Sequence, residues 1–78
     1  DYPAAYNNRG VAYGNLGEYN AAIADYTTAI RLDPDYAKAY TNRGVAKSKT
    51  GLSLCSDFKK ACELGANKCC EWYDDNCR

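Results

Sequence analysis

The chain has 78 residues, ten basic and ten acidic side chains, and no histidine. A neutral chain has no overall field to draw in nucleic acid or an anionic membrane. Without histidine it also lacks the commonest general base and the commonest nitrogen ligand of zinc. We therefore expect one small domain of modest stability that is not an enzyme, holds no metal or cofactor, and has neither a nucleic-acid nor a membrane partner.

The opening of the given sequence does not predict a targeting segment. No apolar run is long enough to cross a bilayer, and the opening Asp1-Tyr2-Pro3 does not resemble a signal peptide. The abrupt start suggests a processed or excised fragment, from which a targeting segment could already have been removed.

An internal repeat occupies most of the chain. Residues 1–17 and 35–51 align at an offset of thirty-four, and ten positions are identical between them. The identical pairs are Asp1/Asp35, Tyr2/Tyr36, Ala5/Ala39, Tyr6/Tyr40, Asn8/Asn42, Arg9/Arg43, Gly10/Gly44, Val11/Val45, Ala12/Ala46 and Gly17/Gly51. Each copy predicts a helix whose opening aspartate caps the N-terminus, and whose mid-helix glycine lets a second helix approach closely.

A second amphipathic helix follows between Gly17 and Pro34. Six apolar residues recur there at three- and four-residue steps, namely Tyr19, Ala22, Ile23, Tyr26, Ala29 and Ile30. A helix this short is marginal alone in water, so its apolar face must pack against the helices on either side.

The helix after Gly51 repeats that pattern with a shift. Its apolar residues match those of the first copy at an offset of thirty-two, which indicates that two residues are missing from the preceding turn; they are Leu54, Cys55, Phe58, Ala61 and Cys62. Gly65 ends this helix. The segment from Ala66 to about Asp75 is predicted to form a fifth helix that covers the last apolar face.

These residues resemble the tetratricopeptide repeat family, whose helix-turn-helix unit is thirty-four residues long. The resemblance is carried by Tyr6, Gly10, Ala12, Tyr13, Gly17, Tyr19, Ala22, Tyr26, Ala29 and Pro34 in the first unit, and by Tyr40, Gly44, Ala46 and Gly51 in the second. It implies an all-α, right-handed solenoid in one domain over residues 1–78. Residues 1–34 and a shortened 35–64 would be its two units, and 65–78 a capping helix and tail.

The NRG- and DY-containing variety of the motif also resembles bacterial, notably cyanobacterial, members. Solenoids usually need about three units for stability. The chain is therefore expected either to come from a longer array or to pair with another copy through its uncovered first helix, where Tyr2 and Tyr6 lie.

The function implied by the resemblance is that of a non-enzymatic scaffold, which binds a peptide or a partner helix in a concave groove. The groove positions would be Asn7, Asn8, Val11, Asn15, Lys38, Thr41, Asn42, Val45 and Lys49. Asparagine suits this role because its amide both donates and accepts hydrogen bonds to an extended backbone. The alternative is that these positions are ordinary solvated helix faces.

One specialised binding mode of the family is disfavoured here. Some members grip the C-terminal carboxylates of chaperones with lysines and asparagines from three units. Asn42 matches one such position, but Asn7 and Val11 replace the expected lysine and asparagine, and a third unit is missing.

Two arginines stand where the family more often has leucine. We interpret Arg9 with Asp25, and Arg43 with Asp57, as ion pairs between the two helices of each unit. A structural role is preferred over ligand binding, since partly buried pairs of this kind help to set helix register.

Five cysteines lie in the final third. Cys55 and Cys62 are seven apart on one helical face, Cys70 and Cys77 repeat that interval, and an antiparallel hairpin around Gly65 would pair Cys62 with Cys70 and Cys55 with Cys77. Cys69 could replace Cys70, and one thiol is left over either way. Such bridges would indicate an oxidising compartment, whether secreted, periplasmic or lumenal, and their absence a cytoplasmic one.

Two other interpretations of the cysteines stay open. They could be small apolar fillers in isoleucine positions, or Cys69, Cys70 and Cys77 could serve a thiol-based redox or disulfide-exchange protein. A zinc site is disfavoured because no C-x-x-C spacing occurs.

Overall fold

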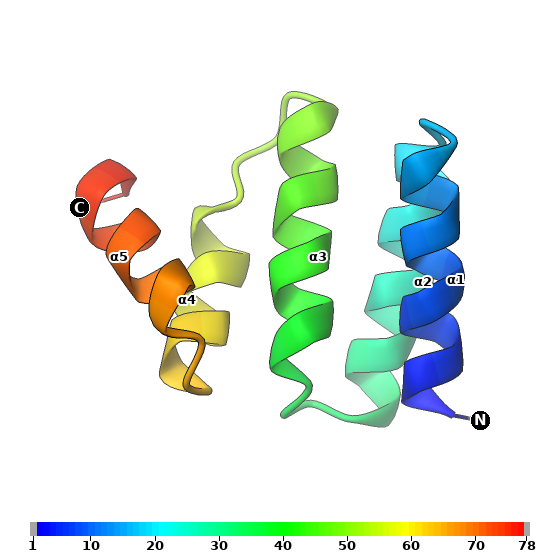
Figure 1. Ribbon diagram of the computed structural model, residues 1–78, viewed down its shortest axis with the longest axis horizontal. Helices are drawn as coiled ribbons and strands as arrows, with labels where there is room; N and C mark the ends of the chain where they lie inside the picture. The colour runs from blue at the N-terminus through cyan, green and yellow to red at the C-terminus, as the bar shows by residue number, and fades with distance from the viewer. Residues whose placement is uncertain (1, 78) are drawn as a thin grey trace.

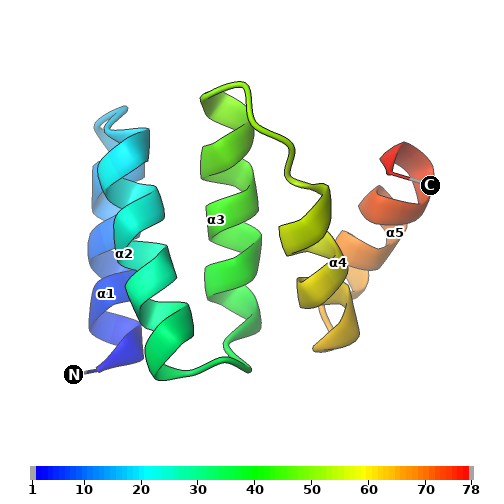
Figure 2. The same ribbon diagram turned by 180° about the vertical axis from the view of Figure 1, so that it is seen from behind.

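A computed structural model describes residues 2–77 of the chain. It contains α1 (Pro3–Asn15), α2 (Tyr19–Leu32), α3 (Ala37–Lys49), α4 (Cys55–Glu63) and α5 (Asn67–Asn76). None of the described residues lies in a strand, so the prediction of an all-α fold with five helices is confirmed. Successive helices pack side by side, and α3 stands between the α1/α2 pair and the α4/α5 pair (Figures 1 and 2).

The helices end where the sequence places glycine. Gly65 has φ 104°, a left-handed conformation that a residue with a Cβ rarely adopts. Its N–H donates to the carbonyl of Cys62, and the N–H of Ala66 donates to that of Ala61, which together satisfy two free carbonyls at the end of α4. Gly17 and Gly51 end α1 and α3 with the same hydrogen-bond pattern.

The predicted aspartate caps are not found. Asp1 lies outside the described residues, and α3 begins after Tyr36 with no side-chain hydrogen bond at its cap. The prediction for Asp35 was wrong because this residue stands one position too early to cap α3. Its own N–H donates instead to Oδ1 of Asp33 at 3.1 Å, so Asp33 organises the turn between α2 and α3.

The two residues that the second unit lacks shorten α4, whereas the sequence predicted that they were missing from the turn before it. The segment between α3 and α4 covers residues 50–54, whereas 16–18 suffice between α1 and α2. As a result α4 has nine residues where α2 has fourteen. Its first turn is replaced by an irregular stretch in which the N–H of Cys55 donates to the hydroxyl of Ser53.

Aromatic rings and small residues form the core. One cluster joins Ala22, Tyr26 and Ala46, and another joins Phe58, Ala61 and Cys69. The ring of Tyr26 lies on Gly10 and the ring of Phe58 on Gly44, so closely that a Cβ on either glycine would come within 3.0 Å of ring carbon. The glycines are therefore what allows α1 and α3 to lie against the helix that follows each of them.

Candidate binding groove

A hollow of about 320 Å³ lies between α1 and α3, with α2 behind them in the view of Figure 1. Val11 on α1 and Val45 on α3 are 39% and 42% exposed, and both belong to the lining of this hollow. The hollow is lined by Val11, Gly14, Asn15, Tyr19, Tyr26, Asn42, Val45, Ala46 and Lys49. It combines apolar walls with two amides and one cation.

The predicted groove residues divide into three groups. Val11, Asn15, Asn42, Val45 and Lys49 line the hollow. Asn8 and Lys38 are exposed on α1 and α3 but lie outside its lining. Asn7 and Thr41 turn toward the protein.

Asn7 is buried, with 4% of its surface exposed. Its Oδ1 accepts a hydrogen bond from Nδ2 of Asn42 at 3.1 Å across the α1/α3 seam. This bond orients the Asn42 amide and leaves its oxygen available to accept a hydrogen bond in the hollow. Asn7 therefore supports a groove residue and does not itself face a partner.

Sequence reasoning missed the back of the hollow, which is formed by Tyr19, Tyr26 and Ala46 with Gly14 at its edge. The two tyrosines were assigned to the apolar face of the second helix, and that face packs on α1 and α3 together. Burial raises the pKa of Tyr26, and the charge of Asp25 beside it adds to the rise. The only signal for this role was the width of the apolar face.

The first arginine pair has the predicted partners. Arg9 donates to Asp25 through Nε at 2.8 Å and through Nη2 at 2.7 Å, a two-pronged contact between α1 and α2. The guanidinium also stacks near the rings of Tyr6 and Tyr13. The hydrogen bond to Asp25 is the main cause of a raised Arg9 pKa, although the arginine side chain is 60% exposed.

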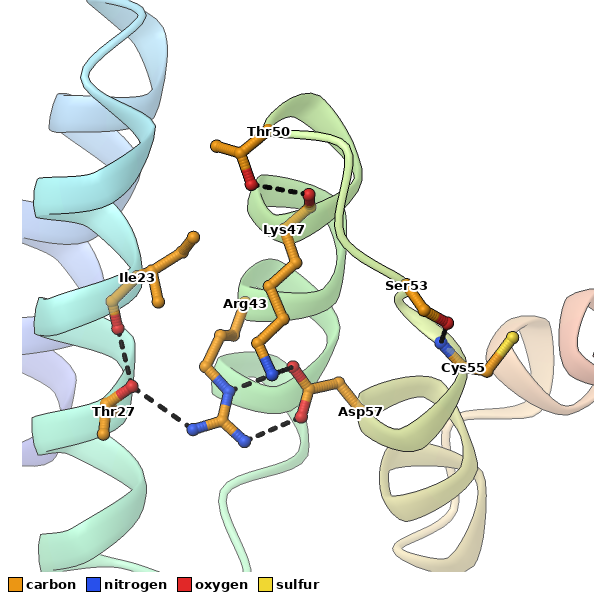
Figure 3. A network of polar contacts seen from close by, with 8 residues as sticks. All are labelled: Ile23, Thr27, Arg43, Lys47, Thr50, Ser53, Cys55 and Asp57. Carbon is orange, nitrogen blue, oxygen red and sulfur yellow. Dashed lines mark hydrogen bonds and ion pairs between the residues drawn. The ribbon is translucent and has the colours of Figure 1, made fainter.

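The second pair lies at the centre of a network that joins three helices (Figure 3). Arg43 donates to Asp57 through Nε at 3.0 Å and Nη2 at 2.7 Å, and through Nη1 to the hydroxyl of Thr27 on α2 at 3.2 Å. Lys47 Nζ adds a contact of 3.3 Å to Asp57, which is only 2% exposed. The hydrogen bond to Asp57 raises the pKa of Arg43 against the opposing effect of burial. Arg43 therefore connects α2, α3 and α4, and so joins the first repeat unit (α1 and α2) to the second (α3 and α4).

The cysteines hold α5 against α4. The structure pairs Cys55 with Cys77 and Cys62 with Cys70, with Cα atoms 5.8 and 4.7 Å apart. Cys69 is the buried free cysteine, and its Sγ lies 3.2 Å from the hydroxyl of Thr41 on α3. Trp72, which is also on α5, packs edge-on against Phe58 of α4, with ring centroids 5.2 Å apart. The redox alternative thus has no exposed thiol in this arrangement, since Cys70 and Cys77 are both bridged.

No helix within residues 2–77 is long and apolar enough to cross a membrane. Comparison with protein families gives a match between residues 3–36 and the family model of the tetratricopeptide repeat. The matched segment holds α1, α2 and the turn that leads to α3, and therefore includes the Arg9–Asp25 pair and half of the hollow. A repeat of this kind indicates a role in protein–protein interaction.

Proposed function

We propose that this chain, whose residues 3–36 match the tetratricopeptide repeat family, is a non-enzymatic interaction module that binds an extended peptide segment of a protein partner between α1 and α3. The observation that supports the proposal is the open hollow, whose lining combines Val11 and Val45 with the amides of Asn15 and Asn42. Apolar walls can hold a side chain, and the amides can bond the backbone that carries it.

The proposed site needs little rearrangement before it binds. Asn42 is held by Asn7, and the helices that carry the walls are tied to their neighbours by the Arg9 and Arg43 networks. A rigid site loses less conformational entropy on binding than a mobile one. In the same proposal residues 35–64 act as the second unit, 65–78 act as a cap that the two cysteine bridges secure, and the whole of 1–78 is one domain.

The test is to select peptides on the immobilised chain by display and to measure their affinities for a variant whose hollow is filled. Gly14→Leu is suited to this, because Gly14 belongs to the lining of the hollow and a Cβ added there meets nothing within 4 Å, which leaves room for a side chain at this position. Ala12→Leu is the matched control, since Ala12 is exposed on the same helix and is not part of the lining.

We expect the selected peptides to lose at least tenfold in affinity for Gly14→Leu and to keep it for Ala12→Leu, about the effect of losing one well-packed apolar side chain. Circular dichroism must show both variants folded. Equal binding to the wild type and to Gly14→Leu would place the site elsewhere and refute the proposal.

A further inference from the structure

The two helices that form the walls of the hollow carry only positive charge. α1 contains Arg9 and α3 contains Lys38, Arg43, Lys47 and Lys49, and neither helix has an aspartate or a glutamate. The whole chain nevertheless has as many acidic as basic residues. The acids of the described residues therefore lie on the other three helices and in the turns.

Three of these five cations already have a carboxylate partner. Arg9 pairs with Asp25, and Arg43 and Lys47 both contact Asp57. Within the described residues Lys38 and Lys49 form no ion pair, and both are exposed. Lys49 belongs to the lining of the hollow, where it is the single charged residue.

The spacing of Lys38 and Lys49 puts both on the groove side of α3. Eleven residues are close to three full helical turns, so the two lysines share a face with Val45 and lie about 16 Å apart along the axis. An extended peptide covers that length in about five residues, but only residues an even number apart have side chains on the same side. A spacing of six residues meets both conditions, because the flexible lysine stems take up the remaining few ångströms. Val45 is about 6 Å from Lys49 along the same axis, which corresponds to about two residues of extended peptide.

We propose that the segment bound in the hollow is acidic, with two carboxylates six residues apart on one side of the extended peptide that pair with Lys38 and Lys49, and with an apolar side chain between them, on the same side, that enters the hollow beside Val45. This inference rests on the proposed function and names the chemistry of its partner. The apolar side chain lies two residues from the carboxylate that meets Lys49. The carboxylates are those of side chains, so the segment does not have to be a C-terminus.

The probe is the acetylated and amidated peptide Asp-Ser-Ser-Ser-Leu-Ser-Asp, whose two aspartates and leucine lie on one side of the extended chain. It is tested together with its reversed sequence, because the peptide can run in either direction along α3. Two comparison peptides replace both aspartates by asparagine or by lysine. Binding to the isotope-labelled full chain is followed by chemical-shift titration at low and at high salt. The protein variants are Lys49→Gln and, as a control with the same change in net charge, Lys59→Gln on the exposed face of α4.

We expect the acidic probe to bind most tightly, with a loss of about four- to twenty-fivefold when both aspartates are replaced by asparagine, and a smaller advantage at high salt. Lys49→Gln should reduce this advantage of the acidic peptide about two- to fivefold, whereas Lys59→Gln should leave it unchanged. The lysine peptide should be the weakest of the three.

The failures of the two proposals are distinguishable. If the asparagine peptide binds as tightly as the acidic one at low salt, and Gly14→Leu still abolishes binding, the hollow is the site but its partner is not acidic. If no peptide shifts the resonances of the residues that line the hollow, both proposals are refuted.

Discussion

Gly10 provides the sharpest test of how α1 packs on α2. An alanine Cβ at this position would lie 2.6 Å from Cε1 and 2.9 Å from Cδ1 of Tyr26, whereas carbon atoms in good contact are about 3.5–4.0 Å apart. The ring is 4% exposed and packs on Ala22 and Ala46, so it cannot move aside by the required distance of about 1 Å without disturbing the core.

Gly14, one turn further along the same helix, separates this contact from the effect of glycine on helix stability. Replacing either glycine by alanine should raise the free energy of unfolding by about 0.5–1 kcal/mol through helix propensity alone. Gly10→Ala also loses about 1–3 kcal/mol through overpacking. The difference in unfolding free energy between Gly10→Ala and Gly14→Ala therefore measures the contact directly, and we expect about 1–3 kcal/mol, with Gly14→Ala the more stable.

The assay is thermal and urea unfolding of both variants and the wild type, followed by circular dichroism at fixed pH and salt. In a domain of this size, 1 kcal/mol corresponds to about 4–8 °C in Tm. We expect Gly14→Ala to melt above the wild type and Gly10→Ala below it. If Gly10→Ala melts together with Gly14→Ala, or above it, the ring of Tyr26 is not held against α1, and the packing described for the first helix pair is wrong.

Three further predictions concern the polar network, the cysteines and the buried tyrosine. Arg43→Met leaves Lys47 as the only ion-pair partner of the buried Asp57, so the free energy of unfolding should fall by about 2–4 kcal/mol. Lys47→Met should then lower the free energy of unfolding by at least about 0.5 kcal/mol more in this variant than in the wild type, and strictly additive losses in urea unfolding would contradict the shared contact. A thiol assay on the oxidised, denatured chain should find one reactive group, that of Cys69, and reduction should lower stability by about 2–4 kcal/mol per bridge; five thiols would show that neither bridge forms. Because the pKa of Tyr26 is raised, its contribution to stability is complete below about pH 10 and is lost as the pH rises through the raised pKa; the stability of the wild type should therefore fall more steeply above pH 10 than that of Tyr26→Phe, and parallel pH profiles would argue against burial of the hydroxyl.

Much of the fold follows from local sequence. Apolar residues at three- and four-residue steps determine which face each helix must bury, and glycines with left-handed geometry determine where α1, α3 and α4 end. The thirty-four-residue offset further indicates that two helix pairs are built alike. These features depend on residues within a few turns of each other, so the order of the chain alone is enough to predict them.

The end of the chain shows how far this reasoning reaches. The equal spacing of the cysteines suggested which rungs of a hairpin could face each other, and the structure pairs Cys55 with Cys77 and Cys62 with Cys70. The prediction favoured Cys70 over its neighbour Cys69 as the partner of Cys62, but the spacing alone left Cys69 open as a replacement. The structure pairs Cys70 with Cys62 and places Cys69, about 100° further around α5, within 3.2 Å of the hydroxyl of Thr41 on α3.

Tertiary structure alone decided what covers each helix face. Arg9 and Arg43 have identical neighbours in the repeat, yet their side chains are 60% and 18% exposed, because α2 lies against α3 and supplies Thr27. Asn7 lies at a position predicted to face the groove and is buried, because Asn42 reaches it across the seam. Periodicity defines the direction in which a side chain leaves its helix, but the neighbour it meets comes from a segment distant in sequence, and only the packing of the helices determines which segment that is.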